Sequence, residues 1–339
     1  LFFEIARILK AKKPSGFLLE NVEGLVTHDR KSAKDKTGNT LDTILDILKE
    51  LGYYVSWAVH DASKFGVPQK RKRIYIVGSL DKKPDIDNFS ENNVFLKNII
   101  ETGKECQQTL FRERLLSLYS KEALYGKAIK DKRGGKDNIH SWDLELKGKL
   151  SSEQKQLMSQ LLKERRKKKW AEEIGIKWMD GMPLTLDQIH SFYGHIERGL
   201  LDEMLTDLAQ KDYIKFEHPK EQVTENGISK RVPQPNKPKG YNIVTGQLSF
   251  ELNKILDPEG VVNTIVATET NKIGVVDEQG IRNLTNRECL RLFGFPDNYQ
   301  VNIKQKDLYD LIGNTVVVPV ISAVSKRTIL SFSEKRLVA

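Results

Sequence analysis

Hydrophobic and polar positions in the first 80 residues follow two different periods. Apolar residues recur at helical spacing between Thr40, which can cap a helix, and Gly52, which can end one. Shorter apolar runs, typical of buried strands, flank this segment. We expect helices at residues 3–12 and 40–51, and strands at residues 16–22, 53–59 and 74–77. Because strand–helix–strand units build parallel sheets, the pattern predicts an α/β fold with a parallel sheet.

The composition changes near residue 81, where Lys-rich helical stretches replace this pattern as far as about residue 258. We expect a helical stretch at 151–174, an extended Pro-, Lys- and Gly-rich loop at 230–240, strands at 263–268 and 274–277, and a helix at 317–330. The composition therefore separates a helix-rich segment from the strand-containing segments before and after it, with boundaries at residues 1–80, 81–260 and 261–339.

Charge and cysteine content narrow the class of protein. The 55 Lys and Arg residues outnumber the 46 Asp and Glu residues, for a net charge of +9. This balance favours a polyanionic partner, although many basic proteins bind no nucleic acid. No apolar run reaches the roughly 18 residues that a membrane span needs, so we expect no membrane partner. The two cysteines, Cys106 and Cys289, do not form a disulfide framework and fit a reducing cytosol.

An acid and two arginines mark the first candidate site. Glu20 follows the apolar run 17–19, at the strand end where open α/β sheets bind ligands. A carboxylate there is costly unless it has a partner or a task. Arg71 and Arg73 precede a second strand and, two residues apart, point the same way. They suit an oxyanion such as phosphate, or alternatively a salt bridge with a neighbouring carboxylate, of which Glu20 is one candidate.

Other polar clusters have simpler interpretations when each is taken alone. Residues 285–288 form a capping box that makes Arg287 and Glu288 structural, on a helix that Gly294 ends. Residues 311–316 lead a helix with a proline in its first turn, where they either bind a polar ligand or simply cap it. The charged run 163–169 reads first as a solvated helix face and second as a DNA contact.

The order and spacing of these clusters are more informative than any one of them. Glu-Asn-Val at 20–22, Gln-x-Arg-x-Arg at 69–73, Arg-Glu-x-x-Arg-Leu-x-Gly-Phe-Pro-Asp at 287–297 and Gly-Asn-Thr-Val at 313–316 occur in this order. The set closely resembles the DNA cytosine-5 methyltransferases of bacterial restriction–modification systems. The resemblance covers residues 1–80 and about 261–330. It implies a partial Rossmann-like, S-adenosylmethionine-dependent methyltransferase domain, with a DNA-binding target-recognition domain at residues 81–260.

The resemblance also implies an activity and roles for particular residues. In this family a cytosine is flipped out of the duplex, a cysteine attacks C6, and C5 takes a methyl group from S-adenosyl-L-methionine. By matching position, Glu20 would hold ring N3 and the exocyclic amine, and Arg73 would contact O2. Arg71 would support this catalytic pocket or contact phosphate. The cofactor would lie against Asn314, Thr315 and, by a weaker match, Leu1; no metal is expected.

One departure from the family is large. The Phe-x-Gly-x-Gly cofactor loop and the Pro-Cys motif with the nucleophile, which precede Glu-Asn-Val in the family, are not in this sequence. Cys106 follows no strand or proline, and Cys289 occupies a variable position, so neither is expected to replace the nucleophile. We expect a fragment, since Leu1 lies within an element, and we expect this chain alone to be inactive. The alternative is the DNA-binding subunit of a split methyltransferase, whose partner supplies the cysteine.

Several partners follow from the resemblance. Double-stranded DNA is the expected substrate, and a missing amino-terminal segment or partner subunit is expected to complete the enzyme. A cognate restriction endonuclease could belong to the same system, in the bacterial cytoplasm at the nucleoid. Arg287 and Glu288 would organise the junction with the recognition domain, and the loops near Gly181 and 230–245 are candidate readers of bases. A dinucleotide-dependent enzyme is a weaker rival, because the sequence has no Gly-x-Gly-x-x-Gly loop.

Overall fold

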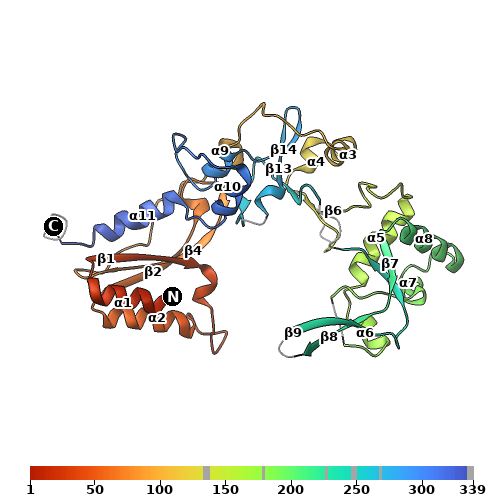
Figure 1. Ribbon diagram of the computed structural model, residues 1–339, viewed down its shortest axis with the longest axis horizontal. Coiled ribbons are helices and arrows are strands. Elements are labelled where there is room, and N and C mark those ends of the chain that lie inside the picture. The colour runs from red at the N-terminus through yellow and green to blue at the C-terminus, as the bar shows by residue number, and fades with distance from the viewer. Residues whose placement is uncertain (133–137, 178–179, 226–227, 246–249, 267–268, 334–339) are drawn as a thin grey trace. The chain divides into compact units, whose positions relative to one another are not determined.

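The chain forms two compact units in the computed structural model (Figure 1), which describes residues 1–132, 138–177, 180–225, 228–245, 250–266 and 269–333. The first unit comprises Leu1–Lys104, Leu256–Val275 and Asn283–Ala339, and the second comprises Glu105–Ile255 and Val276–Arg282. The first boundary therefore lies at residue 104 and not at the predicted residue 80. Ile86 and Leu96 explain the difference, because both are buried in the core of the first unit.

The first unit contains most of the elements that the sequence predicted for an α/β domain. Its helices are α1 (Phe2–Lys12), α2 (Asn39–Glu50), α9 (Asn286–Arg291), α10 (Gln305–Ile312) and α11 (Val318–Ile329). Its strands are β1 (Gly16–Val22), β2 (Tyr54–Asp61), β3 (Gln69–Lys70), β4 (Lys72–Ser79) and β12 (Val262–Asn263). The predicted strand 263–268 is thus mostly not a strand, and residues 267–268 lie outside the described residues.

The main sheet has the order β1-β4-β2, and the predicted parallel sheet is wrong for these strands. β4 lies between the other two and is antiparallel to both, with Glu20 opposite Tyr75 on one side and Ala58 opposite Tyr75 on the other. The reason is the short connection 62–71 between β2 and β4. It is shorter than the dozen or more residues that a parallel crossover requires, so the chain folds back as an antiparallel pair.

Both faces of this sheet are covered, as the continuous apolar run at residues 74–77 requires. On one face Ile74 and Ile76 pack with α1 and α2. On the other face Tyr75 and Val77 pack with residues of α9, α10 and α11, including Val320. Figure 1 shows α1 and α2 on one side of the sheet and α11 on the other. Tyr75, Arg73 and Glu20 therefore belong to the face toward α11, since they alternate with the face toward α2.

The helix ends are partly as predicted. The α9 capping box is confirmed, with the Thr285 hydroxyl accepting from the Glu288 amide and the Glu288 carboxylate accepting from the Thr285 amide. α2 is different: Gly38 is its N-cap, and the Thr40 hydroxyl donates to Asp29 at 2.8 Å and does not cap the helix. α11 begins after Val317, with no side-chain cap, so the Asn-Thr pair at 314–315 is not its cap.

The second unit combines helices with short strands. Its elements are α3 (Leu110–Leu118), α4 (Lys121–Leu124), β5 (Ala128–Ile129), β6 (Asn138–Ile139), α5 (Ser152–Glu164), α6 (Lys169–Glu173), α7 (Leu186–Phe192), α8 (Arg198–Gln210), β7 (Ile214–Glu217), β8 (Lys220–Glu225), β9 (Ile228–Pro233), β10 (Gly240–Ile243) and β11 (Lys254–Ile255). The chain passes between the units within β13 (Ile273–Asp277) and β14 (Gly280–Asn283). None of the helices in the described part of the chain is long and apolar enough to span a membrane.

Two predictions within the second unit need correction. The helical stretch 151–174 is broken between α5 and α6, and in this break the buried Arg165 donates to Asn242 at 2.5 Å. Burial lowers the pKa of this guanidinium to about 10. The expected loop at 230–240 begins as strand β9, which pairs with β8 in an antiparallel hairpin. Its Pro and Lys residues are compatible with a strand because this hairpin has only two strands and hence two exposed edges.

Candidate active site

Glu20 and Arg73 meet on the neighbouring strands β1 and β4 of the first unit. Glu20 Oε1 lies 3.1 Å from Arg73 Nε, and the two side chains are 26% and 17% exposed. The register explains the contact, since Arg73 lies opposite Val22, two residues beyond Glu20, and diagonal neighbours on one face are within reach of long side chains. The structure thus places the carboxylate and one predicted arginine together at the end of β1.

Tyr75 is a third member of this face that the sequence analysis did not identify. It lies directly opposite Glu20, and it is 2% exposed. Burial raises the pKa of the Tyr75 hydroxyl, and the negative charge of Glu20 adds to the shift. The phenol therefore stays protonated, so the charges at this point of the sheet come from the Glu20–Arg73 pair.

Arg71 lies close to this pair but has a different set of contacts. Its guanidinium donates to the carbonyl oxygens of Ile265 at 3.3 Å and of Gly313 and Thr315 at 3.1 Å each. The residue is 5% exposed, and its guanidinium carbon lies 5.3 Å from the centre of the Phe293 ring. Burial lowers the pKa of Arg71, and the charge of Arg73 acts in the same direction. Arg71 therefore fixes the backbone at residues 313–315. An oxyanion could bind this guanidinium only by displacing those carbonyl oxygens.

Gln69, two residues before Arg71 in the same motif, also holds a distant segment of backbone. It is fully buried and donates through Nε2 to the carbonyl oxygen of Leu292 at 2.9 Å. The short strand β3 that carries it pairs in parallel with β12, and the Thr264 hydroxyl donates to the Lys70 carbonyl oxygen at 2.7 Å. The Gln-x-Arg-x-Arg motif thus holds distant segments of the chain against the sheet edge. Its residue order alone did not reveal this role.

A cavity of about 380 Å³ opens beside the ion pair. Arg73 is one of its lining residues; the others are Val22, Glu23, Gly24, Asp61, Lys70, Lys72 and Thr264. Its volume lies in the usual range for small-molecule sites. Lys72 and Glu23 form a loose ion pair across it at 3.8 Å. The charged groups that line this cavity are therefore one guanidinium, two ammonium groups and two carboxylates.

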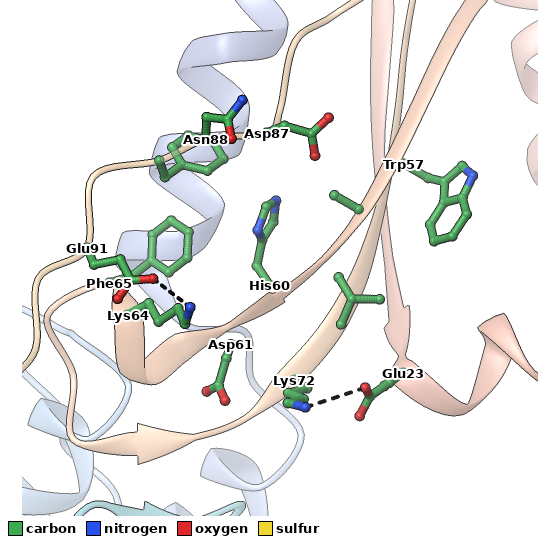
Figure 2. Close-up of a pocket in the computed structure, with 13 residues that line it drawn as sticks. Glu23, Trp57, His60, Asp61, Lys64, Phe65, Lys72, Asp87, Asn88 and Glu91 are labelled. Carbon is green, nitrogen blue, oxygen red and sulfur yellow. Dashed lines mark hydrogen bonds and ion pairs between the residues drawn. The ribbon is translucent and has the colours of Figure 1, made fainter. Parts of the chain in front are cut away.

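A larger cavity of about 950 Å³ shares Glu23, Asp61 and Lys72 with the smaller one (Figure 2). Figure 2 shows the His60 ring between β2 and the segment that carries Asp87 and Asn88. Burial lowers the pKa of His60, against the opposing effect of Asp87. The carboxylates that line this larger cavity are those of Glu23, Asp61, Asp87 and Glu91, and the ammonium groups are those of Lys64 and Lys72. Because the acidic side chains of this cavity outnumber its cations, it is poorly suited to a phosphate.

The predicted cofactor residues are not all brought together. Asn314 and Thr315 follow α10 and lie next to Arg71, through the Thr315 carbonyl oxygen. Asn314 is exposed and donates from Nδ2 to the Asp310 carbonyl oxygen at 3.2 Å. Leu1 lies at the start of α1, and its side chain is fully exposed. The structure therefore places Asn314 and Thr315 near the arginines, whereas it gives Leu1 no packed position.

Arg287 and Glu288 have structural contacts within the first unit. Arg287 donates to the carbonyl oxygens of Pro296 at 3.2 Å and Tyr299 at 3.0 Å. The Glu288 side chain is fully buried and accepts from the backbone amides of Thr285 and Glu101 at 2.7 and 2.8 Å. Both residues fix the loops around α9, in agreement with the interpretation that each motif has when taken alone.

Both cysteines are poor nucleophiles in this structure. Cys289 is 1% exposed and Cys106 is 8% exposed. Burial raises the pKa of each thiol, and the neighbouring carboxylates of Glu288 and Asp277, respectively, add to the effect. A thiolate is the reactive form of cysteine, so raised pKa values and burial both oppose attack on a substrate.

Known DNA methylases are similar to most of this chain. The family model of the C-5 cytosine-specific DNA methylases matches residues 1–329. The Type II methyltransferase M.NlaIV of Neisseria lactamica is 57% identical over 327 residues, covering 96% of this chain and 76% of that protein. The Type II methyltransferase M.BanI of Aneurinibacillus aneurinilyticus is 36% identical over 349 residues, covering 96% of this chain and 73% of that protein.

Among solved structures, the S. pombe Dnmt2 methyltransferase matches with a TM-score of 0.43 and 13% identity, covering 97% of this chain and 71% of that one. This likeness is too low to add to the family assignment. The family match spans most of the chain, and the two relatives are 57% and 36% identical to it over the aligned residues. The chain belongs to the C-5 cytosine-specific DNA methylase family.

Proposed function

We propose that this protein methylates C5 of cytosine in double-stranded DNA, as part of a bacterial restriction–modification system in the cytoplasm. The observation that carries the proposal is the Glu20–Arg73 pair, 3.1 Å apart beside a cavity, in a chain of the C-5 cytosine methylase family. The relatives named as Type II methyltransferases support the system that we propose.

The pair suits the polar edge of a cytosine. A cytosine inside a duplex has its edge covered, so the base must first be flipped out of the stack. Glu20 can then accept from the exocyclic amine and share a proton with ring N3, while Arg73 donates to O2. Protonation at N3 keeps full negative charge from building up on the ring when a nucleophile attacks C6. General acid catalysis of this kind contributes about 10²- to 10⁴-fold to a rate.

Arg71 is a positioning residue in this proposal. Its buried guanidinium holds the carbonyl oxygens of Gly313 and Thr315, and therefore fixes the exposed Asn314 between them. We propose that Asn314 and Thr315 hold the methionine end of S-adenosyl-L-methionine, because a carboxamide and a hydroxyl offer both donors and acceptors to an amino acid. Leu1 would offer an exposed apolar contact for the adenine. When bound, this cofactor supplies the methyl group.

The nucleophile has to come from outside these 339 residues. Cys106 and Cys289 are buried, and their thiol pKa values are raised. We propose that a segment with the family's Pro-Cys motif, in the same polypeptide or in a partner subunit, completes the site. Without it, we expect this chain to bind DNA and to transfer no methyl group. The second unit would supply the recognition of the DNA sequence.

Methyl transfer to duplex DNA tests the proposal. The chain is assayed with labelled S-adenosyl-L-methionine, alone and together with a segment that bears the Pro-Cys motif, and the DNA is digested to identify the modified base. We expect 5-methylcytosine only when the segment is present, and none when its cysteine is changed to serine. Label on cytosine N4 or adenine N6 would contradict the reaction. DNA binding without any transfer after complementation would identify a non-catalytic DNA-binding subunit instead.

A further inference from the structure

The hairpin of β8 and β9 differs from the other strands of the second unit because most of its side chains are exposed. It pairs over residues 220–225 and 228–233, and it joins no further strand in the described part of the chain. Figure 1 shows it extending away from α5 and α8 of the same unit. An isolated hairpin buries little apolar surface, so its exposed face is free to serve a task other than packing.

The register separates the hairpin into two different faces. Gln222 lies opposite Arg231 and Thr224 lies opposite Ser229, so these four side chains share one face. All four are polar and exposed. The other face carries Val223 opposite Lys230, with Val223 half-buried. One face therefore consists of hydrogen-bonding groups, and the other is partly packed.

The base of the hairpin is held in place by the unit beneath it. The Gln234 amide donates to the Pro219 carbonyl oxygen at 2.8 Å, and the Glu221 carboxylate accepts from the Lys177 amide at 3.2 Å. Lys220 forms an ion pair with Glu217 at 3.1 Å. The polar face is thus presented from a fixed base, which limits the ordering cost of binding.

We propose that the face carrying Gln222, Thr224, Ser229 and Arg231 reads base edges in the major groove of the DNA target; this inference rests on the proposed function. The major groove admits a two-stranded β-ribbon. Within the described residues the Arg231 side chain makes no ion pair or hydrogen bond, so its guanidinium is available for a bidentate contact with the O6 and N7 atoms of a guanine.

Gln222 is suited to an adenine. Its Nε2 donates to the Ser229 hydroxyl at 2.5 Å, which holds the amide over the face. A primary amide has two N–H groups and a carbonyl oxygen, so one donor and the acceptor remain. This combination matches the N7 and N6 atoms of adenine. Gln222 and Arg231 face each other across the strands, so we expect them to read the same or adjacent base pairs.

The test selects bound sequences from a random duplex DNA library, using the whole chain and three variants. Arg231→Lys keeps the charge but cannot make the bidentate contact, and Gln222→Ala removes the amide. Lys230→Ala is the matched control, because it removes a charge from the opposite face of the same hairpin. Circular dichroism of each variant checks that the fold is retained.

We expect the wild-type chain to select a defined site. Arg231→Lys should relax the preference at one or two base pairs by about 5- to 100-fold, as loss of a bidentate contact does, with little change in non-specific affinity. Lys230→Ala should keep the preference and lower the salt dependence by at most about one ion. Gln222→Ala should relax a position next to that of Arg231.

Two results would overturn the inference. Either the wild-type chain selects no sequence, or Arg231→Lys and Gln222→Ala select the wild-type site with unchanged preference. The second result would leave the proposed methylation intact, because Arg231 takes no part in the chemistry. Conversely, absence of methyl transfer in the complemented enzyme, with altered selection by Arg231→Lys, would remove the proposed reaction and keep the reading face.

Discussion

Replacement of Arg71 by methionine removes the guanidinium that joins the sheet edge to residues 313–315. Methionine keeps an unbranched apolar side chain in place of the arginine stem, so the change deletes the guanidinium with its charge and its donors and keeps part of the packing. The carbonyl oxygens of Ile265, Gly313 and Thr315 each lose a charged donor. Arg71 is 5% exposed, so water has little access to replace these three hydrogen bonds.

The loss can be estimated from those contacts. A hydrogen bond to a charged group contributes about 1.5–3 kcal/mol. The three bonds share one guanidinium, so they are not additive, and removal of its burial cost offsets part of the loss. We expect a local destabilisation of about 3–5 kcal/mol, which accelerates opening of the loop by about 100-fold or more.

Hydrogen exchange by mass spectrometry measures this opening at residues 313–316 and 262–265. A local assay is preferable to global unfolding because a chain with two units need not unfold in one step. Arg287→Met is the control, since Arg287 also donates to two carbonyl oxygens but at the surface. We expect its loop to open less than about 5-fold faster. Equal, small effects in both variants would refute a positioning role for Arg71.

Three further predictions concern burial and backbone conformation. Gly294→Ala should lower the free energy of unfolding by about 2 kcal/mol or more, since φ is +74° and a Cβ would lie 2.3 Å from Pro319. Gly24→Ala is the control, because a Cβ there would lie in open space, and it should change the free energy of unfolding by under about 0.5 kcal/mol. Equal melting temperatures of the two variants would contradict this. Burial lowers the pKa of His60, so the unfolded chain takes up a proton first and stability should fall as the pH drops below about 6.5. His60→Phe should reduce that fall in urea titrations at pH 7 and pH 5, and an unchanged pH dependence would argue against it. Iodoacetamide should label Cys106 and Cys289 only after unfolding, because both thiols are buried with raised pKa values. Rapid labelling of either cysteine in the native protein would make that cysteine a candidate nucleophile.

Local features of the fold could be predicted from the sequence because they depend on neighbouring residues. The α9 capping box and the strand at 16–22 are confirmed, and the salt bridge between Glu20 and Arg73 was one of two stated alternatives. The antiparallel sheet was predicted wrongly, although the short connection 62–71 contained the necessary information.

Long-range contacts could not be predicted in the same way. The partners of Arg71 lie 194 to 244 residues further along the chain, and no local period encodes them. The β8–β9 hairpin was hidden for a different reason: its strands are exposed on one face, so polar residues replace the apolar alternation by which strands are recognised. In both cases the proposed role depends on residues that bury little of their own surface or that meet only after folding.

The Glu20–Arg73 pair is the centre of the account, and turnover of a Glu20→Gln variant tests it most directly. The measurement is the rate of methyl transfer to duplex DNA by the complemented enzyme, with the DNA dissociation constant determined in parallel. Glutamine keeps the shape of the side chain but cannot share a proton with cytosine N3. We expect the rate to fall by about 100-fold or more, with DNA affinity nearly unchanged. A rate equal to that of the wild type would contradict the assignment of this pair to the cytosine.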